Sequence, residues 1–269
     1  VTYMEPKGQP RDIAIIPTIL SAVKRNPKGR IIEPQDLKIK LRAGHQRLLM
    51  LIVLDASDSM RVFIPIITRM LLKFQKIAWR MRSLVGLITC YRDIARIVTY
   101  PTTNINKLLA GLFDIEFSGK TPLAKGLLLA HRLLRSLSIK NPDAIPRILL
   151  ISDGLANIPL DKPLDPTLRE IIPSEAQADV LAVAKLLSKR RVKIIAVNPW
   201  HITEWHSRIF ISPTRLLIKI TEMTRGVYIG IDAGRIIVRD IFTTKMIISD
   251  KEANYIADNI IAAIFESLY

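Results

Sequence analysis

Side chains that could bind a metal ion occur at three separate places in the sequence, each following an apolar run or opening a helix. They are Asp55, Ser57 and Ser59 after residues 47–54, Thr121 at the expected start of a helix, and Asp153 after residues 147–152. Two carboxylates and three hydroxyls without sulfur form an all-oxygen set, which suits a hard cation such as Mg²⁺ (or Mn²⁺). Because the hydroxyls are neutral, such an ion would stay under-neutralised and would seek a further carboxylate from outside.

Each of these features is weak on its own. A string such as Asp55 to Ser59 arises by chance, and a serine or aspartate after a strand is commonly only a helix cap. Their occurrence together, in this order and each at a strand end or a helix start, is much more specific. The alternate spacing of Asp55, Ser57 and Ser59 also lets one extended turn aim three side chains at one point. We therefore predict a metal site.

Strand-like and helix-like segments alternate along the chain. Continuous apolar runs that end at a carboxylate, typical of buried parallel strands, occupy 47–55 and 147–154. Further strands are expected at 83–91, 95–101, 192–198 and 227–231, and helices at 61–82, 104–113, from 121 onward, 174–190 and 213–225. This alternation predicts an α/β fold with a doubly wound, mainly parallel sheet and helices on both faces. Such sheets bind ligands outside the carboxyl ends of their strands.

Three helix starts carry their own signals. Thr121 is expected to cap its helix, with Pro122 at the first helical position. Ser174 is expected to cap the helix at 174–190. The last helix is expected to start at Ser249 in a capping box with Glu252, and its apolar stripe consists of Ala253, Ile256, Ile260 and Ile264.

The sequence suggests three parts. Residues 1–45 contain five prolines and fit the alternating rhythm poorly, so they are expected to form an amino-terminal extension with one helix near 15–24. The α/β domain is expected at 46–235. Residues 236–269 would then be a carboxyl-terminal extension with the terminal helix.

Composition excludes several classes of protein. A hydrophobic content of 49% is too high for a mainly disordered chain. The single cysteine, Cys90, closes an apolar strand and is expected to be a buried core residue; one cysteine excludes a disulfide scaffold and favours a reducing compartment, the cytoplasm. No apolar run approaches the ~18 uncharged residues of a membrane span.

The charge balance is strongly basic, with 40 Lys and Arg against 24 Asp and Glu and a net charge of +16. This surplus favours an acidic partner: nucleic acid, an anionic membrane surface or an acidic protein. The 42 isoleucines and only five glutamines offer another explanation, because hyperthermophile proteins share this usage. The basic residues are scattered, without a block of five like charges, so we expect no cluster of cations large enough for a nucleic-acid groove.

Other chemistries fit less well. Gly119-Lys120-Thr121 mimics the end of a phosphate-binding loop, but Asp114 stands where its first glycine is required. The stretch HITEWH at 201–206 could suggest zinc, yet its spacing matches no helical zinc motif. A phosphatase of the D-x-D-x-T kind fails because Ser57 replaces its second aspartate.

The strings DASDSM, SGKTPLAKGL and LLISDGLAN resemble the three parts of the metal-ion-dependent adhesion site of von Willebrand factor type A domains. Their nearest likeness is to the carboxyl-terminal domain of the magnesium chelatase D subunit, and the resemblance extends over about residues 10–235. It implies that Ser57, Ser59 and Thr121 would contact the metal directly. Asp55 and Asp153 would then hold it mainly through water.

The resemblance implies an interaction module that is not catalytic alone. It would be the D-type subunit, or a fragment of one, of a magnesium or cobalt chelatase-like complex. Its partners would be a ring-forming AAA+ ATPase subunit, contacted through an acidic residue, and a larger chelatase subunit. The alternative is a nucleic-acid-binding protein of the same fold, for which no basic stripe with interleaved aromatics is visible. A Mg²⁺-dependent phosphoryl-transfer enzyme is third and lacks an evident nucleophile.

This sequence departs from the family pattern at three positions near the proposed metal. Asp58 stands where glycine is common and adds a negative charge. Lys120 precedes the threonine where glycine is usual, and a cation there should weaken metal binding unless it turns away. Leu155 replaces a common arginine, which would alter partner contacts.

Overall fold

The computed structural model describes residues 2–4, 15–27, 32–41, 47–199, 211–231 and 250–266. The chain divides into two compact units, residues 1–45 and 46–269. The first unit pairs β1 (Thr2–Met4) with β2 (Ile39–Leu41) in an antiparallel ribbon and contains α1 (Ile15–Arg25), which matches the helix expected near 15–24. Within this unit Arg25 donates through Nε and Nη2 to the buried carboxylate of Asp36, the last residue of a short 3₁₀ turn at Pro34–Asp36.

The second unit is built on a six-stranded sheet in the order β5-β4-β3-β6-β7-β8. Its strands are β3 (Arg47–Asp55), β4 (Leu84–Tyr91), β5 (Ile94–Thr102), β6 (Ala144–Ile151), β7 (Lys193–Asn198) and β8 (Val227–Gly230). All neighbouring pairs are parallel except β4 and β5, which form a hairpin. The doubly wound, mainly parallel sheet expected from the sequence is therefore confirmed.

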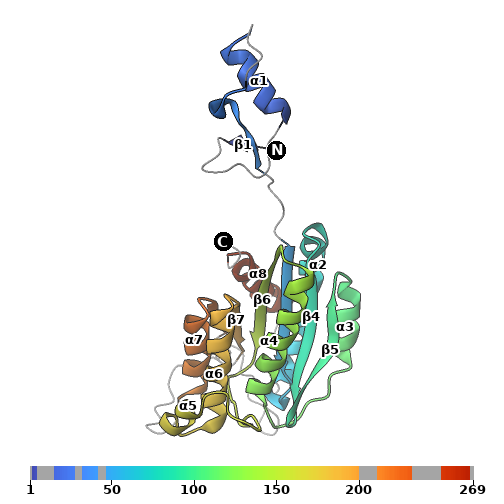
Figure 1. Ribbon diagram of the computed structural model, residues 1–269. Helices are drawn as coiled ribbons and strands as arrows, with labels where there is room; N and C mark the ends of the chain where they lie inside the picture. Colours follow the sequence, from blue (N-terminus) through green and yellow to red (C-terminus); the bar gives the residue numbers. More distant parts are fainter. Residues whose placement is uncertain are drawn as a thin grey trace. The chain divides into compact units, whose positions relative to one another are not determined.

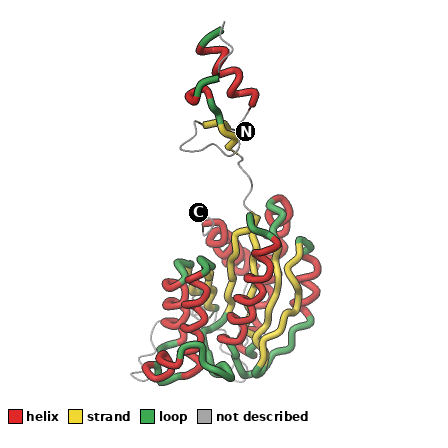
Figure 2. Tube along the Cα trace, in the orientation of Figure 1, coloured by secondary structure: helices red, strands yellow, loops and turns green. Residues whose placement is uncertain are grey.

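Helices cover both faces of this sheet (Figures 1 and 2). One face carries α2 (Ile64–Arg80), α3 (Ile105–Phe113) and α8 (Asp250–Glu266), and the other carries α4 (Leu123–Lys140), α6 (Glu175–Lys189) and α7 (Pro213–Met223); a short helix, α5 (Pro166–Ile171), precedes α6. Along β3, Met50 and Ile52 pack against the first layer of helices, whereas Leu51 and Val53 pack against the second. Burial on both sides explains why this strand is apolar without interruption.

The terminal helix packs into the core of the second unit. Ile260 and Ile264 of α8 are fully buried against the first layer, and Lys73 of α2 forms an ion pair with Asp258 at 2.7 Å. The expected capping residue of this helix, Ser249, lies outside the described residues.

Two helix starts differ from the sequence expectation. Residues Asp58–Phe63 form a 3₁₀ helix, and α2 begins at Ile64 rather than at Arg61. In an α-helix starting at Arg61, the carbonyl of Arg61 would accept the backbone N–H of residue 65. Residue 65 is a proline, which has no backbone N–H to donate. The amide of Ile64 donates to that carbonyl instead.

Thr121 was expected to cap α4, and this prediction was wrong. The capping position belongs to Pro122, whose carbonyl accepts the amide of Gly126 at 3.0 Å. The hydroxyl of Thr121 is directed to Asp55 instead, at 3.1 Å. A bond to a buried carboxylate is stronger than a neutral cap, which explains the choice. By contrast, Ser174 caps α6 as expected.

Within the described part of the chain, none of the helices combines the length and apolar character that crossing a membrane requires.

Candidate metal centre

The five residues singled out in the sequence meet where the winding of the sheet reverses. From β3 the chain moves outward to β4 on one side, whereas from β6 it moves outward to β7 on the other. Strands β3 and β6 are parallel neighbours, so the loops after them diverge at their carboxyl ends, which is where sheets of this kind bind ligands. Asp55 is the last residue of β3, and Asp153 follows β6 by two residues.

Asp55 is completely buried and is held by three neutral donors. Its Oδ1 accepts the amide of Ser57 at 2.9 Å and the hydroxyl of Thr121 at 3.1 Å. Its Oδ2 accepts the hydroxyl of Ser152 at 2.9 Å. Among the residues that the structure describes, neither Asp55 nor Asp153 forms an ion pair. A buried carboxylate without a cation is costly, and the arrangement is therefore suited to receive one.

The serine hydroxyls connect this carboxylate to the second one. Ser57 Oγ lies 3.0 Å from Ser59 Oγ, and Ser59 Oγ donates to Asp153 Oδ2 at 3.2 Å. Asp153 Oδ1 accepts the amide of Leu155 at 2.9 Å. Adjacent oxygens around a Mg²⁺ ion, each at about 2.1 Å, lie about 3 Å apart in octahedral geometry. The observed spacing of these hydroxyls fits such a shell.

Two further residues, Ser152 and Asn157, hydrogen-bond to these candidate ligands, and neither was predicted from the sequence. Ser152 donates to Asp55 and accepts the amide of Gly154 at 3.0 Å, so one hydroxyl connects the ends of β3 and β6. Asn157 Oδ1 accepts the amide of Thr121 at 2.7 Å. A polar residue placed directly after a buried strand is the signal that could have identified Ser152.

Gly154 allows the loop after β6 to turn next to α7. Its φ is +86°, a conformation that side chains rarely adopt, and a Cβ there would collide with the carbonyl of Pro213. The glycine thus fixes the path of the backbone that carries Asp153.

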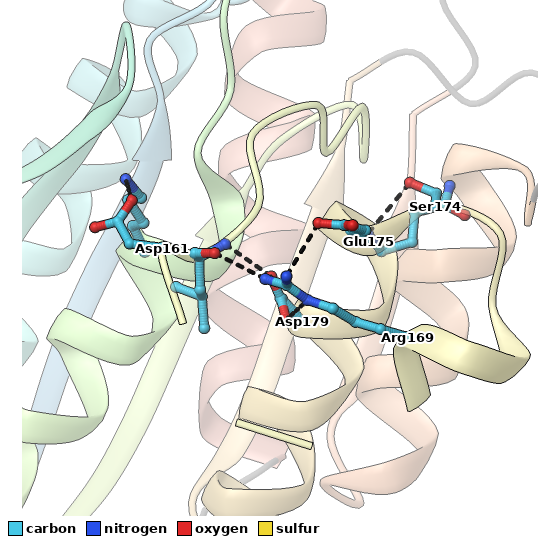
Figure 3. Close-up of polar contacts among 8 residues, drawn as sticks. Asp161, Arg169, Ser174, Glu175 and Asp179 are labelled. Carbon is cyan, nitrogen blue, oxygen red and sulfur yellow. Dashed lines mark hydrogen bonds and ion pairs between the residues drawn. The ribbon is translucent and has the colours of Figure 1, made fainter. Parts of the chain in front are cut away.

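The connection from β6 to α6 is held by Arg169 (Figure 3). Its guanidinium binds both carboxylate oxygens of Asp179, at 3.0 and 2.6 Å, and donates to the carbonyl of Leu160 at 2.7 Å. Asp179 is 1% exposed and also accepts the amide of Leu160 at 2.7 Å. Glu175 contributes a more exposed ion pair at 3.0 Å. This network holds the segment that follows Asp153 against the body of the domain.

The three departures from the family pattern all lie at the surface. Asp58 is exposed, and its carboxylate lies 3.5 Å from Nη2 of Arg61, which offsets the added charge. Lys120 is exposed as well. Leu155 is 54% exposed and lies two residues after Asp153.

The other features considered in the sequence do not add a second reactive or ligand-binding site in the described residues. Cys90 is fully buried and its thiol pKa is raised by burial and then by Asp55, as expected for an inert core residue. Gly119-Lys120-Thr121 follows a helix and a loop rather than a strand, unlike a phosphate-binding loop. The HITEWH stretch at 201–206 lies outside the described residues. The ranges that the structure describes contain no cluster of three or more His, Cys, Asp and Glu residues able to hold a metal.

Burial, followed by the neighbouring charge of Asp153, raises the pKa of Asp55 from an ordinary 3.8 to about 6. The folded state therefore binds this proton more tightly than the unfolded chain does. Its contribution to stability is fully present below about pH 4 and is lost as the pH rises through about 6.

We predict that Asp55→Asn removes this pH dependence in the metal-free protein. The free energy of unfolding of wild type minus that of the variant should fall by up to about 3 kcal/mol between about pH 4 and pH 7. Urea unfolding in the presence of a chelator measures it. Taking the difference cancels the other titrating groups, and a difference that does not change with pH would contradict the raised pKa.

Comparison with known proteins agrees with this architecture. Residues 50–155 match the family model of the von Willebrand factor type A domain. The chain is 26% identical over 205 residues to the magnesium-chelatase 67 kDa subunit of Chlorobaculum parvum, covering 69% of this chain and 32% of that subunit. It is 30% identical over 125 residues to an uncharacterized protein of Mycobacterium tuberculosis, covering 46% of this chain and 20% of that protein. The chain thus spans a third or less of the length of these relatives.

Solved structures share the fold at low sequence identity. The pilus adhesin SpaC of Lactobacillus rhamnosus GG superposes with a TM-score of 0.57 at 14% identity, over 82% of this chain and 30% of the adhesin. The vWF domain of the pilus tip protein Mfa5 of Porphyromonas gingivalis gives 0.51 at 12% identity, over 81% and 96%. Together with the sheet order, these findings show that the chain contains a region, residues 50–155, that matches the von Willebrand factor type A domain, and that the chain is distantly similar to magnesium-chelatase subunits.

Proposed function

We propose that residues 46–269 form a metal-dependent protein-interaction module. Asp55, Ser57, Ser59, Thr121 and Asp153 would bind Mg²⁺ (or Mn²⁺) at the carboxyl edge of the sheet. The observation that carries this proposal is the buried carboxylate of Asp55, which has only neutral donors and is connected to three hydroxyls and a second carboxylate. When bound, the ion would offer an open coordination position to a carboxylate of a partner.

The chain's own residues divide this work between them. Ser57, Ser59 and Thr121 would supply neutral oxygens, and Asp55 and Asp153 would supply charge, mainly through water. Because few protein charges face the ion, an external carboxylate would bind it strongly. Ser152 and Asn157 would keep the ligands in place through the bonds they already make to Asp55 and Thr121.

The likeness to chelatase subunits supports a more specific role. We infer a non-catalytic D-type subunit, or a fragment of one, that works in the cytoplasm with a ring-forming AAA+ ATPase, and with a larger chelatase subunit. An acidic residue of the ATPase would be the carboxylate that the metal captures. The exposed Leu155 and Lys120 would lie at this interface and adjust its specificity.

The experiment measures binding of a magnesium-chelatase ATPase subunit and, separately, of a random DNA duplex. Each titration is run with and without chelator, at about 50 and about 200 mM salt. We expect a chelator-sensitive, modestly salt-dependent complex with the ATPase that the double variant Ser57→Ala/Ser59→Ala abolishes. The exposed Ser136→Ala on α4 serves as the matched control and should bind normally.

Nucleic-acid binding is the competing function, and the same series decides between the two. Tight DNA binding that ignores the chelator, falls steeply with salt and survives the serine double variant would refute the metal bridge. The charge of +16 would then be the relevant property of the chain.

A further inference from the structure

A second candidate site lies at the opposite edge of the sheet from Asp55. The last turns of α4 and α6 and the amino ends of β6 and β7 surround a hollow of about 770 Å³. Because β3, β6 and β7 are parallel, their amino ends lie at the edge away from the metal centre. The two helices pack against each other on one face of the sheet (Figure 1). The hollow is therefore separate from the metal centre.

The rim of this hollow is cationic. Arg135 from α4 and Lys189 and Arg190 from the end of α6 line it and are exposed, together with the partly exposed His131. No carboxylate lines it, and Asp143, which adjoins the lining residue Pro142, is not among the lining residues. In the described part of the chain, the three long cations form no ion pair.

Cations near the carboxyl end of a helix commonly do no more than neutralise the negative end of the helix dipole. Each dipole end is equivalent to about half a negative charge, so the two helices offset about one of the three long cations. The rim therefore keeps about two of its three long cations without a neutralising charge. Burial, followed by Arg190, Arg135 and Arg132, lowers the pKa of His131, which agrees with this excess of positive charge.

The sequence alone does not show this cluster, because the basic residues are scattered along the chain. The packing of α4 against α6 brings residues 131–135 next to residues 189–190, more than fifty positions later in the sequence.

The floor of the hollow indicates which kind of anion fits. Leu134, Leu186 and Val192 line it, and no Phe, Tyr or Trp is among the lining residues. The lining therefore offers a base only the imidazole of His131 and arginine guanidinium planes on which to stack. An apolar floor below a cationic rim instead suits an apolar side chain flanked by carboxylates.

We propose that this hollow is a docking site for an acidic protein segment that inserts an apolar side chain between α4 and α6, without any need for metal. The carboxylates of the segment pair with Arg135, Lys189 and Arg190. This contact is independent of the metal-bridged one, so the domain presents two surfaces to acidic partners, one at each edge of its sheet.

The test uses a fluorescent peptide of about twelve residues in which two leucines are flanked by aspartates and glutamates. Anisotropy measures its binding to the full chain in the presence of chelator. We expect Arg135→Gln/Arg190→Gln to weaken binding at least about tenfold. The control Lys107→Gln/Lys219→Gln removes the same charge from exposed positions on α3 and α7 and should change affinity less than about twofold.

Three comparisons make the proposal falsifiable. A peptide with alanine in place of leucine should bind more weakly, because the floor then loses its contact. Equal weakening by the two double variants would show a general charge effect and overturn the site. Tighter binding of a DNA duplex, lost in Arg135→Gln/Arg190→Gln, would overturn the choice of an acidic protein segment.

Discussion

Replacing Asp55 with asparagine is expected to lower the affinity for Mn²⁺ by at least about 100-fold. Mutating a residue that only supports a metal ligand lowers metal affinity by about 10–100-fold, and losing a proposed ligand itself should lower it more. The carboxylate contributes negative charge at a fully buried position where no described cation competes for it. Asparagine keeps the size of the side chain and an acceptor for Ser57 and Thr121 but removes the charge. Isothermal calorimetry with Mn²⁺ at about pH 7.5, above the pKa of Asp55, measures the loss.

Controls separate a lost ligand from a lost fold. The variant should be as stable as wild type or more stable near neutral pH without metal, because the buried charge is gone. Asp161→Asn removes an exposed carboxylate that, among the described residues, pairs only with Lys125, and this variant should bind Mn²⁺ normally. Ser152→Ala should weaken Mn²⁺ binding by about tenfold, because that hydroxyl is a supporting group that holds Asp55 and Gly154 in place and is not itself a proposed ligand. Equal Mn²⁺ binding by wild type and Asp55→Asn would place the metal elsewhere.

Replacing Arg169 with methionine should destabilise the domain by about 2–3 kcal/mol. The variant leaves Asp179 buried without its cation and removes the donor to the carbonyl of Leu160 (Figure 3). Urea unfolding measures the change. Because Arg169 holds the connection that follows Asp153, metal affinity should also fall in the folded variant.

A double variant isolates the cause. Arg169→Met/Asp179→Leu removes both charges and should recover part of the stability lost in the single variant. Lys185→Met breaks an ion pair with Asp165 in which the lysine is exposed and should cost less than about 0.5 kcal/mol. A single Arg169→Met variant as stable as wild type would show that this network does not hold the loop.

Local sequence patterns determined the secondary structure elements and the edge of the sheet at which Asp55 and Asp153 lie. The continuous apolar run of β3 indicated a strand buried on both faces, because only such a strand has no polar side. Asp55 and Asp153 could be placed at one edge, because the carboxyl ends of neighbouring parallel strands meet there. The all-oxygen character of the set follows from residue types alone.

Other features depended on contacts between distant segments. The role of Thr121 changed from helix cap to donor because Asp55, 66 residues earlier, offers a charged acceptor. Ser152 and Asn157 acquired their roles in the same way, through partners that local spacing does not reveal. The cationic hollow could not be found in the sequence, because Arg135 and Arg190 become neighbours only when α4 and α6 pack on the same face of the sheet. Periodicity determined the elements and the edge of the sheet that carries the proposed metal ligands, whereas packing between distant segments decided the hydrogen-bond partners and the location of unpaired cations.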